Sequence, residues 1–357
     1  MPFFDLDTSQ LAEALEGQAP YRTKQVWQGA YEGLQAPSEL TTLPKALRQR
    51  IAQDPRFTLE LVRVDRIAAD DGRTIKDLWQ LADGRQVESV LMAYSDRVTL
   101  CVSSQAGCAM GCVFCATGQA GFFRHLTRGE ILEQVFHAAA LSRRAFGQRL
   151  SNLVFMGMGE PMANYDNVMA AIRSIVRDFG ISARHITLST VGIIPGIRRL
   201  ADEDLPISLA VSIHAANDEK RTRLVPMNSR YPLDDLVEAL EYYRSRSNRR
   251  ISFEWAMMAG INDGPKDAVE LAALARQVGA HINLIPLNPT PGWDYPGSAP
   301  DDVREFRDRL ADLGVNATVR ANRGNQIAAA CGQLQTQFSR RAQGGSRPNT
   351  QDLFRPA

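Results

Sequence analysis

From residue 97 onward, short apolar runs alternate with amphipathic segments, and this alternation limits the possible folds more than any other feature. The apolar runs are VTLCVS, LSNLVFMGMG, RHITLST, PISLAVSIH, RISFEWAMM, HINLIPLN and VNATVRAN. The amphipathic segments between most of them are residues 128–145, 166–178, 194–201, 232–245, 265–278 and 301–313. Strands that alternate with helices form a parallel sheet with helices outside it. Six or seven such units are typical of a complete or partial barrel rather than a doubly wound sheet.

The rest of the chain predicts three smaller parts. Residues 1–50 show helical patterns such as YRTKQVWQGAYEGL, which predicts a small helical accessory domain. Residues 51–96 alternate apolar and polar residues around the turn sequences DDGR and ADGR, which predicts a β-rich extension. The barrel is expected at residues 97–334. The polar tail, residues 335–357, is expected to be disordered.

Composition excludes some classes of protein. The chain has 357 residues, is 44% hydrophobic and carries a net charge of +1, so any basic surface for a nucleic acid would be local. Its first residues do not resemble a secretory signal, and no run approaches the roughly 18 apolar residues of a membrane span. We therefore expect a cytoplasmic protein with no membrane partner. In a reducing cytosol, clustered cysteines bind metal or do chemistry more often than they form disulfides.

Three of the five cysteines lie in the stretch GCAMGCVFC, at Cys108, Cys112 and Cys115. Thiolates of this kind suit zinc or an iron–sulfur cluster. Structural zinc needs four ligands, usually in two separated pairs, and His125 is the only nearby candidate for a fourth. Three cysteines leave one iron of a four-iron cluster without a protein ligand, and an open coordination position is a catalytic feature. We therefore favour the iron–sulfur interpretation.

The cysteine spacing C-x3-C-x2-C, with Phe114 before the last cysteine, resembles the radical S-adenosylmethionine (SAM) signature. The resemblance implies a [4Fe-4S] cluster whose open iron binds SAM, and cleavage of SAM by one electron to a 5′-deoxyadenosyl radical. GMGEP at 157–161 resembles the glycine-rich motif that holds the methionine amino group of SAM. Taken alone, this motif is an ordinary turn between a strand and a helix; its position after the cysteines makes it informative.

A longer series of motifs resembles the RlmN/Cfr family of radical SAM methyltransferases, which act on an adenine of 23S rRNA. In order, the motifs are DRVTLCVSSQAGCAMGCVFCATGQAGFFRHLTRGEILEQV, NLVFMGMGEPMANYDNV, ITLSTVGIIPGI, SIHAANDEKRTRLVPMN, NLIPLNPTPG and AACGQL. The resemblance covers about residues 20–334 and implies an α/β fold, a partial (β/α)6-type TIM barrel. It favours methylation of adenine C2, as in RlmN, in 23S rRNA, with tRNA as a further substrate of some family members. The alternatives are C8 methylation of the Cfr type, another radical SAM enzyme such as a glycyl-radical activase, and a non-catalytic metal-binding RNA module.

The resemblance also assigns roles to the cysteines outside the cluster. Cys331 would accept a methyl group from a first SAM and become S-methylcysteine. A radical derived from a second SAM would then activate that methyl, which would add to the adenine carbon and join RNA to protein. Cys101 would attack the Cys331 sulfur, form a disulfide and release the methylated base. Glu88 matches the family's proton acceptor, although without the resemblance it would be an ordinary surface glutamate on an edge strand.

Further positions match cofactor contacts in the family. They are Gly159, Glu160, Ser189, Ser212, Ile213, His214 and Asn288. One stretch departs from the family pattern R-G-D-D-I-D-A-A-C, because Asn325, Gln326 and Ala328 stand where acidic residues are frequent. We therefore expect the loop that presents Cys331 to be held differently from that of the best-known members.

RNA and an external electron donor, such as a flavodoxin-type reductant, are the expected partners of a monomeric enzyme. Three basic stretches are candidates for RNA contact, although each is also typical of a solvated surface: residues 142–149, 243–250 and 339–347. In the N-terminal helices, the candidates are Tyr21, Arg22, Lys24 and Trp27. The aromatic residues among them are more typical of the hydrophobic core of that small domain.

Overall fold

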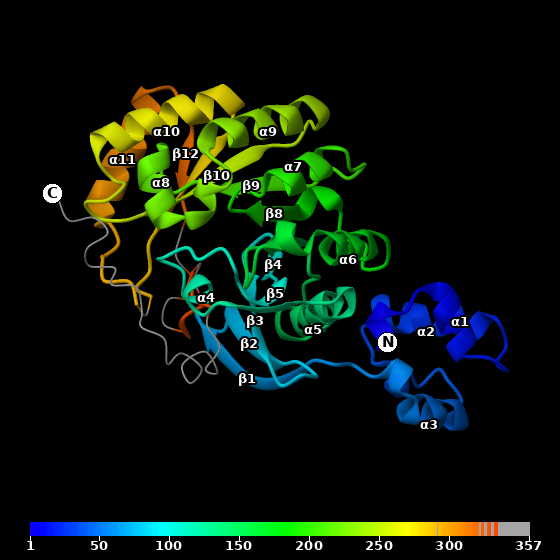
Figure 1. Cartoon of the computed structure of the whole chain (residues 1–357). Coiled ribbons are helices and arrows are strands. Elements are labelled where there is room, and N and C mark those ends of the chain that lie inside the picture. The colour runs from blue at the N-terminus through cyan, green and yellow to red at the C-terminus, as the bar shows by residue number, and fades with distance from the viewer. Residues whose placement is uncertain (291, 321–322, 325–326, 330–331, 335–357) are drawn as a thin grey trace.

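The computed structural model describes residues 1–290, 292–320, 323–324, 327–329 and 332–334 (Figure 1). Its main sheet contains all seven apolar runs as parallel strands. They are β4 (Val98–Cys101), β7 (Asn152–Phe155), β8 (Ile186–Thr190), β9 (Ser208–Ser212), β10 (Ile251–Met257), β11 (His281–Pro286) and β12 (Ala317–Val319). These strands lie side by side in chain order. A doubly wound sheet would reverse its order at a switch point, so the order confirms the barrel type of α/β fold.

Six helices fill the predicted amphipathic segments, each within one residue at both ends. They are α5 (Arg128–Phe146), α6 (Tyr165–Arg177), α7 (Ile194–Ala201), α9 (Leu233–Arg246), α10 (Pro265–Val278) and α11 (Pro300–Asp312). A shorter helix, α8 (Asp218–Leu224), precedes α9. Local chemistry sets the limits of α5: Thr127 and Glu130 form a capping box at its start, and Gly147 ends it with a left-handed φ of 63°.

The β-rich extension continues the barrel sheet. Its strands β1 (Val62–Ala69), β2 (Thr74–Gln80) and β3 (Gln86–Ala93) form an antiparallel meander, and β3 also pairs antiparallel with β4. The main sheet therefore runs from β1 to β12, and the structure describes no pairing between these two edges. Because β3 lies between two partners, its side chains are mostly buried.

A small second sheet brackets the cysteine motif. Its strands are β5 (Gln105–Gly107) and β6 (Phe122–His125), which pair antiparallel, and the short helix α4 (Ala116–Gln119) lies between them in the chain. The cysteine loop thus leaves β5 and returns through α4. This hairpin holds the loop over the carboxyl ends of the barrel strands, where barrel enzymes carry their chemistry.

The N-terminal segment forms α1 (Thr8–Ala14), α2 (Tyr21–Tyr31) and α3 (Lys45–Gln53), which lie beside α5 and α6 (Figure 1). The Phe4 ring lies 5.3 Å from that of Phe136 in α5, and Trp27 donates a hydrogen bond to Asp178 at the end of α6. One continuous cluster of buried apolar residues includes both this segment and the barrel. Among the described residues, no helix combines the length and the apolar character needed to cross a membrane.

Candidate functional site

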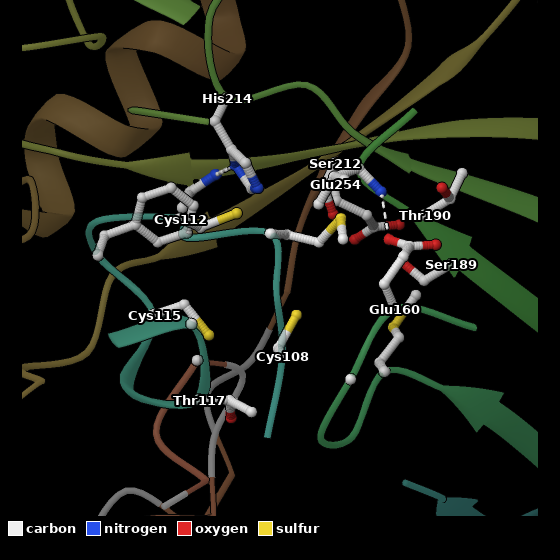
Figure 2. Close-up of a pocket in the computed structure, with 18 of the residues that line it drawn as sticks. Cys108, Cys112, Cys115, Thr117, Glu160, Ser189, Thr190, Ser212, His214 and Glu254 are labelled. Carbon is white, nitrogen blue, oxygen red and sulfur yellow. Dashed lines mark hydrogen bonds between the residues drawn. The ribbon is translucent and has the colours of Figure 1, made fainter. Parts of the chain in front are cut away.

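The three clustered cysteines lie on one loop that faces a cavity at the carboxyl ends of the strands (Figure 2). The loop turns at Gly107, whose φ is +76°, and a Cβ there would lie 2.0 Å from the carbonyl oxygen of Gly121. Only glycine fits so close an approach. The amide of Cys108 donates to the same Gly121 carbonyl at 2.8 Å, which closes the base of the loop.

The surroundings of these thiols suit a bound cation. Burial raises the pKa of Cys108 to about 12 and also raises the pKa of Cys112, and the neighbouring thiols add to both shifts. Without a metal the thiols of Cys108 and Cys112 therefore stay protonated, whereas iron favours the thiolate form. In the part of the chain that the structure describes, no three His, Cys, Asp or Glu side chains converge closely enough to hold a single metal ion. The thiols of Cys108, Cys112 and Cys115 instead line a wider cavity.

His125, the candidate fourth zinc ligand, has another partner. Its Nδ1 lies 3.0 Å from Nε2 of Gln105, and its side chain does not belong to the described lining of the cavity. Gln105 also accepts a hydrogen bond from the amide of Glu160 at 2.8 Å. His125 therefore helps to hold the β5–β6 hairpin beside the site.

The cavity has a volume of about 970 Å³, including space open to solvent, and five successive strands contribute to its walls. Residues at or just after the ends of these strands line it: Gly157, Gly159 and Glu160 after β7, Ser189 and Thr190 in β8, Ser212 and His214 at β9, Glu254 and Ala256 in β10, and Ile285 and Leu287 at β11. The cavity joins polar groups on one side to the cysteine loop on the other (Figure 2). Such a mixture suits a molecule with a charged end and an apolar or aromatic body.

Gly159 and Glu160 form the turn after β7. Gly159 has a φ of +102°, and a Cβ there would lie 2.5 Å from Cβ of Gln105, so the turn needs glycine. Both carboxyl oxygens of Glu160 accept backbone N–H groups, from Met162 at 3.0 Å and from Val191 at 2.9 Å. Burial nevertheless raises the pKa of Glu160 to about 7. Glu160 therefore ties the end of β7 to the end of β8.

His214 supports the cysteine loop. It lies just after β9 with a left-handed φ of 58°, and its Nδ1 accepts a hydrogen bond from the amide of Ala256 at 3.0 Å. Burial lowers the pKa of His214 to about 3, so the ring is neutral and carries its proton on Nε2. The ring meets Phe114 edge-on, with 4.7 Å between the centroids. The residue before Cys115 is therefore fixed by packing.

The other predicted cofactor contacts differ in position. Ser189 and Ser212 line the cavity (Figure 2). The Ile213 side chain packs in the main hydrophobic core instead. Asn288 is buried in the loop after β11 and is not part of the cavity lining that the structure describes. Nearby, Thr290 donates a hydrogen bond to the carbonyl of Phe114 at 2.9 Å.

Two charged residues at the site, Arg221 and Glu254, were not predicted from the sequence. Arg221 in α8 is fully buried, and its guanidinium donates to the carbonyls of Val191 and Ile213 at 2.6 Å and 3.2 Å. It therefore joins the ends of β8 and β9. Glu254 places a buried carboxylate in the cavity wall from β10, where Asn283 donates to it at 2.8 Å. Glu254 could have been predicted as a site residue, because it is a carboxylate inside the otherwise mostly apolar run RISFEWAMM.

Cys101 lies in a second cavity of about 1350 Å³, again including open space. Met92, Val154, Arg320 and Ala329 also line this cavity. Cys101 is buried at the end of β4, opposite Val90 of β3. Directly paired residues and alternate residues share one face of a sheet, so Glu88 lies on the same face as Cys101. Glu88 is buried rather than on a surface, and it pairs with Lys76 at 3.1 Å.

Cys331 lies outside the described residues, as do Asn325 and Gln326. Residues on either side of Cys331 are described. Ala329 lines the cavity that contains Cys101, whereas Gly332 lines the cavity that contains the cysteine loop. The Gly332 carbonyl accepts a hydrogen bond from the amide of Ala116 at 2.8 Å.

Residues 102–272 match the family described as the radical SAM superfamily. The chain is 50% identical over 339 residues to a protein of Mycobacterium marinum, with 93% of each chain covered. It is 48% identical over 342 residues to a protein of Corynebacterium diphtheriae, covering 93% of this chain and 92% of the other. Both relatives carry the description "probable dual-specificity RNA methyltransferase RlmN".

The chain belongs to the RlmN family. A crystal structure of a radical SAM methyltransferase from Sphaerobacter thermophilus agrees, with a TM-score of 0.90 and 44% identity, covering 94% of this chain and 99% of that one. Membership in the RlmN family implies a [4Fe-4S] cluster and SAM as cofactors. The predicted family, fold class and cofactors are thereby confirmed.

Proposed function

We propose that this protein is a radical SAM methyltransferase that methylates C2 of an adenine in 23S rRNA and in tRNA. The observation that carries the proposal is the loop of three cysteines over a polar cavity, in a chain that is similar to RlmN relatives along 93% of its length. The relatives' description as dual-specificity RNA methyltransferases supports RNA as the substrate and more than one kind of RNA.

Cys108, Cys112 and Cys115 would hold the cluster and leave its fourth iron open to SAM. When bound, the cluster and SAM supply a radical that can abstract a hydrogen atom from an unactivated methyl group. The protein's contribution is to bind and to orient. Ser189 and Ser212 offer hydroxyl groups inside the cavity, while Gly159 and Glu160 shape the turn that closes its side. The side chains of Ile213 and Asn288 are not part of the described cavity lining, so these residues would contact SAM through their backbone or position the neighbouring loops.

Cys331, Cys101 and Glu88 would carry the steps on RNA. The Cys331 thiolate would attack the methyl carbon of one SAM, forming S-methylcysteine and releasing S-adenosylhomocysteine. Once that carbon is bonded to the adenine ring, Glu88 would accept the proton that leaves the ring carbon. Attack of the Cys101 thiolate on the Cys331 sulfur would form the disulfide and release the methylated base. The placement of Glu88 and Cys101 on one face of adjacent strands supports their action on one adduct.

The N-terminal residues 1–50 would form an accessory surface for RNA. Tyr21 is 60% exposed, and the Arg22 guanidinium lies 4.7 Å from its ring centroid. An exposed aromatic ring beside an arginine suits unpaired bases and phosphates. Trp27, by contrast, packs against the hydrophobic core. The protein would act in the cytoplasm as a monomer. A flavodoxin-type donor would supply the electrons for SAM cleavage.

The deciding experiment identifies the modified nucleoside. Protein with a reconstituted cluster is incubated with SAM, a reductant and either 23S rRNA fragments or tRNA. The RNA is then digested and chromatographed against 2-methyladenosine and 8-methyladenosine. We expect 2-methyladenosine from both RNAs. The 8-methyl product would assign the Cfr-type activity instead. If the enzyme cleaves SAM but yields neither methylated adenosine, the proposal is overturned.

A Cys101→Ala variant tests the thiol chemistry. The adduct between RNA and protein should form but not resolve, because the attacking sulfur is missing. Gel electrophoresis under denaturing conditions should therefore show a band of covalently linked RNA and protein. Multiple turnover by this variant at the wild-type rate would contradict the role given to Cys101.

A further inference from the structure

Lys76 places a buried positive charge between two parts of the proposed reaction site. It lies in β2 and is 9% exposed. Its Nζ is 3.1 Å from Oε1 of Glu88 and donates to the carbonyl oxygen of Ala328 at 3.2 Å. Glu88 is 4% exposed, so both charges of this pair are withdrawn from water. Burying a charge is costly without such partners.

The contact with Ala328 belongs to a set of bonds that anchor the segment before Cys331. The amide of Gly324 donates to Oδ2 of Asp70 at 3.2 Å, and Nη1 of Arg323 donates to the carbonyl of Ala93 at 2.8 Å. Of these three bonds, that of Lys76 lies closest in sequence to Cys331. Ala328 has a left-handed φ of 50°, which is unfavourable for alanine and must be held by its surroundings.

We propose that Lys76 is a positioning residue for the methyl-transfer reaction, and this inference rests on the proposed function of Glu88 and Cys331. Its ammonium group holds Glu88 as a carboxylate that can accept a proton. The same group also donates to the Ala328 carbonyl and so anchors the segment that precedes Cys331. One charged side chain is thus bonded both to the proposed base and to the segment that precedes Cys331.

Among the described residues, few other charged groups share the surroundings of this pair. The titratable groups on the Glu88 face of the neighbouring strands are Lys76 in β2, Asp65 in β1 and Cys101 in β4. Arg66 and Asp77 pair at 2.6 Å on the opposite face, where Trp79 stacks on His137 of α5. From the C-terminal segment, Arg323 is bonded to Ala93, while Asp70 is bonded to Thr74 and Gly324. Among the described groups, Lys76 is therefore the cation expected to favour the charged form of Glu88.

The test is the pH dependence of a single turnover in the cluster-loaded full-length protein. An opposite charge lowers a carboxyl pKa, so Lys76→Met should raise the pKa of Glu88. Glu88 would then be protonated at a higher pH, and the acidic limb of the rate of 2-methyladenosine formation should move up by about one pH unit or more. Lys76→Gln should show the same shift, because it lacks the charge but keeps a donor for Ala328. Lys76→Arg should restore the wild-type profile.

Arg66→Met is the matched control, because it removes an ion pair from the opposite face of the same sheet. Its profile should not move. Thermal unfolding and iron content of each variant establish that it is folded and loaded. As a second readout, trypsin should cut after Arg323 faster in Lys76→Met than in Arg66→Met, since the Ala328 anchor is lost.

Two failures are distinguishable. Wild-type protein that makes no methylated adenosine overturns the proposed function itself. The role of Lys76 alone is overturned if the wild type is active and the folded Lys76 variants have the same pH profile as the wild type. A lower rate with an unshifted profile in Lys76→Gln also counts against it, because a purely structural residue would behave in that way.

Discussion

Among single residues, Cys112 is the most enclosed of the three cluster cysteines. It is 8% exposed, and its carbonyl accepts the amide of Cys115 at 3.1 Å, so the side chain and the backbone of the loop are both constrained. Cys112→Ser should therefore abolish cluster binding with little change to the fold. Iron content and the visible absorption of the reconstituted protein are the measurements. Cys101→Ser should keep the full cluster, because Cys101 lies in the second cavity. Equal iron in both variants would contradict the assignment.

The structure changes how two individual residues are understood. Glu88 was expected, apart from the family resemblance, to be an exposed residue on an edge strand. It is buried because β3 pairs on both sides, with β2 and with β4. Arg221 gave no signal in the sequence, since DEKRTR is typical of a solvated helix. Its burial depends on the loops after β8 and β9 closing over α8, which no local pattern can predict.

At the scale of elements, Glu133 joins helix α5 to the entry of the β-rich extension. Its two carboxyl oxygens accept the amides of Glu60 and Leu61, each at 2.8 Å. A glutamine can offer only one oxygen, so Glu133→Gln should lower the free energy of unfolding by about 1–3 kcal/mol. Urea unfolding measures the loss. Glu305→Gln, which changes an exposed pair with Arg309, should cost less than about 1 kcal/mol.

Glu133 also makes stability depend on pH. Burial raises its pKa in the folded protein from 4.5 to about 8, so the folded state holds this proton more tightly than the unfolded state. Stability from this source is complete below about pH 4.5 and is lost as the pH rises through about 8. The free energy of unfolding of the wild type should therefore fall relative to Glu133→Gln over that range. A constant difference between the two proteins would contradict this.

The elements themselves were largely predictable, whereas their long-range pairing was not. The six amphipathic segments were located to within one residue, because helix periodicity and caps such as Thr127 and Gly147 are local signals. The antiparallel pairing of β3 with β4 joins the extension to the barrel, and it depends on contacts that no local pattern encodes. The site was predicted in the same uneven way. The cluster, the turn after β7 and the serines came from motifs, but Glu254 and Lys76 became meaningful only through their neighbours.

For the whole molecule, the shared hydrophobic core predicts that the N-terminal helices and the barrel unfold together. Phe4 is fully buried and contacts rings from both parts, including Phe136 of α5 and Tyr31 of α2. Phe4→Ala should lower the free energy of unfolding by about 3–5 kcal/mol. Hydrogen-exchange mass spectrometry should show faster exchange in residues 1–57 and also in α5. Tyr21→Ala, at a residue that is 60% exposed, is the control and should change stability by less than about 0.5 kcal/mol. Faster exchange confined to residues 1–57 would contradict a shared core.

The two cavities in the barrel share Met156 and Ile285 in their walls. One cavity holds the cluster cysteines, and the other holds Cys101. A thiol readily gives a hydrogen atom to a carbon radical, which would end the radical before it reached its target. In the proposed reaction, the shared wall would separate the Cys101 thiol from the cavity in which the radical is generated, and enclosed sites suppress side reactions in this way. A smaller side chain in this wall would be expected to increase the amount of SAM cleaved per methylated base, rather than to slow SAM cleavage.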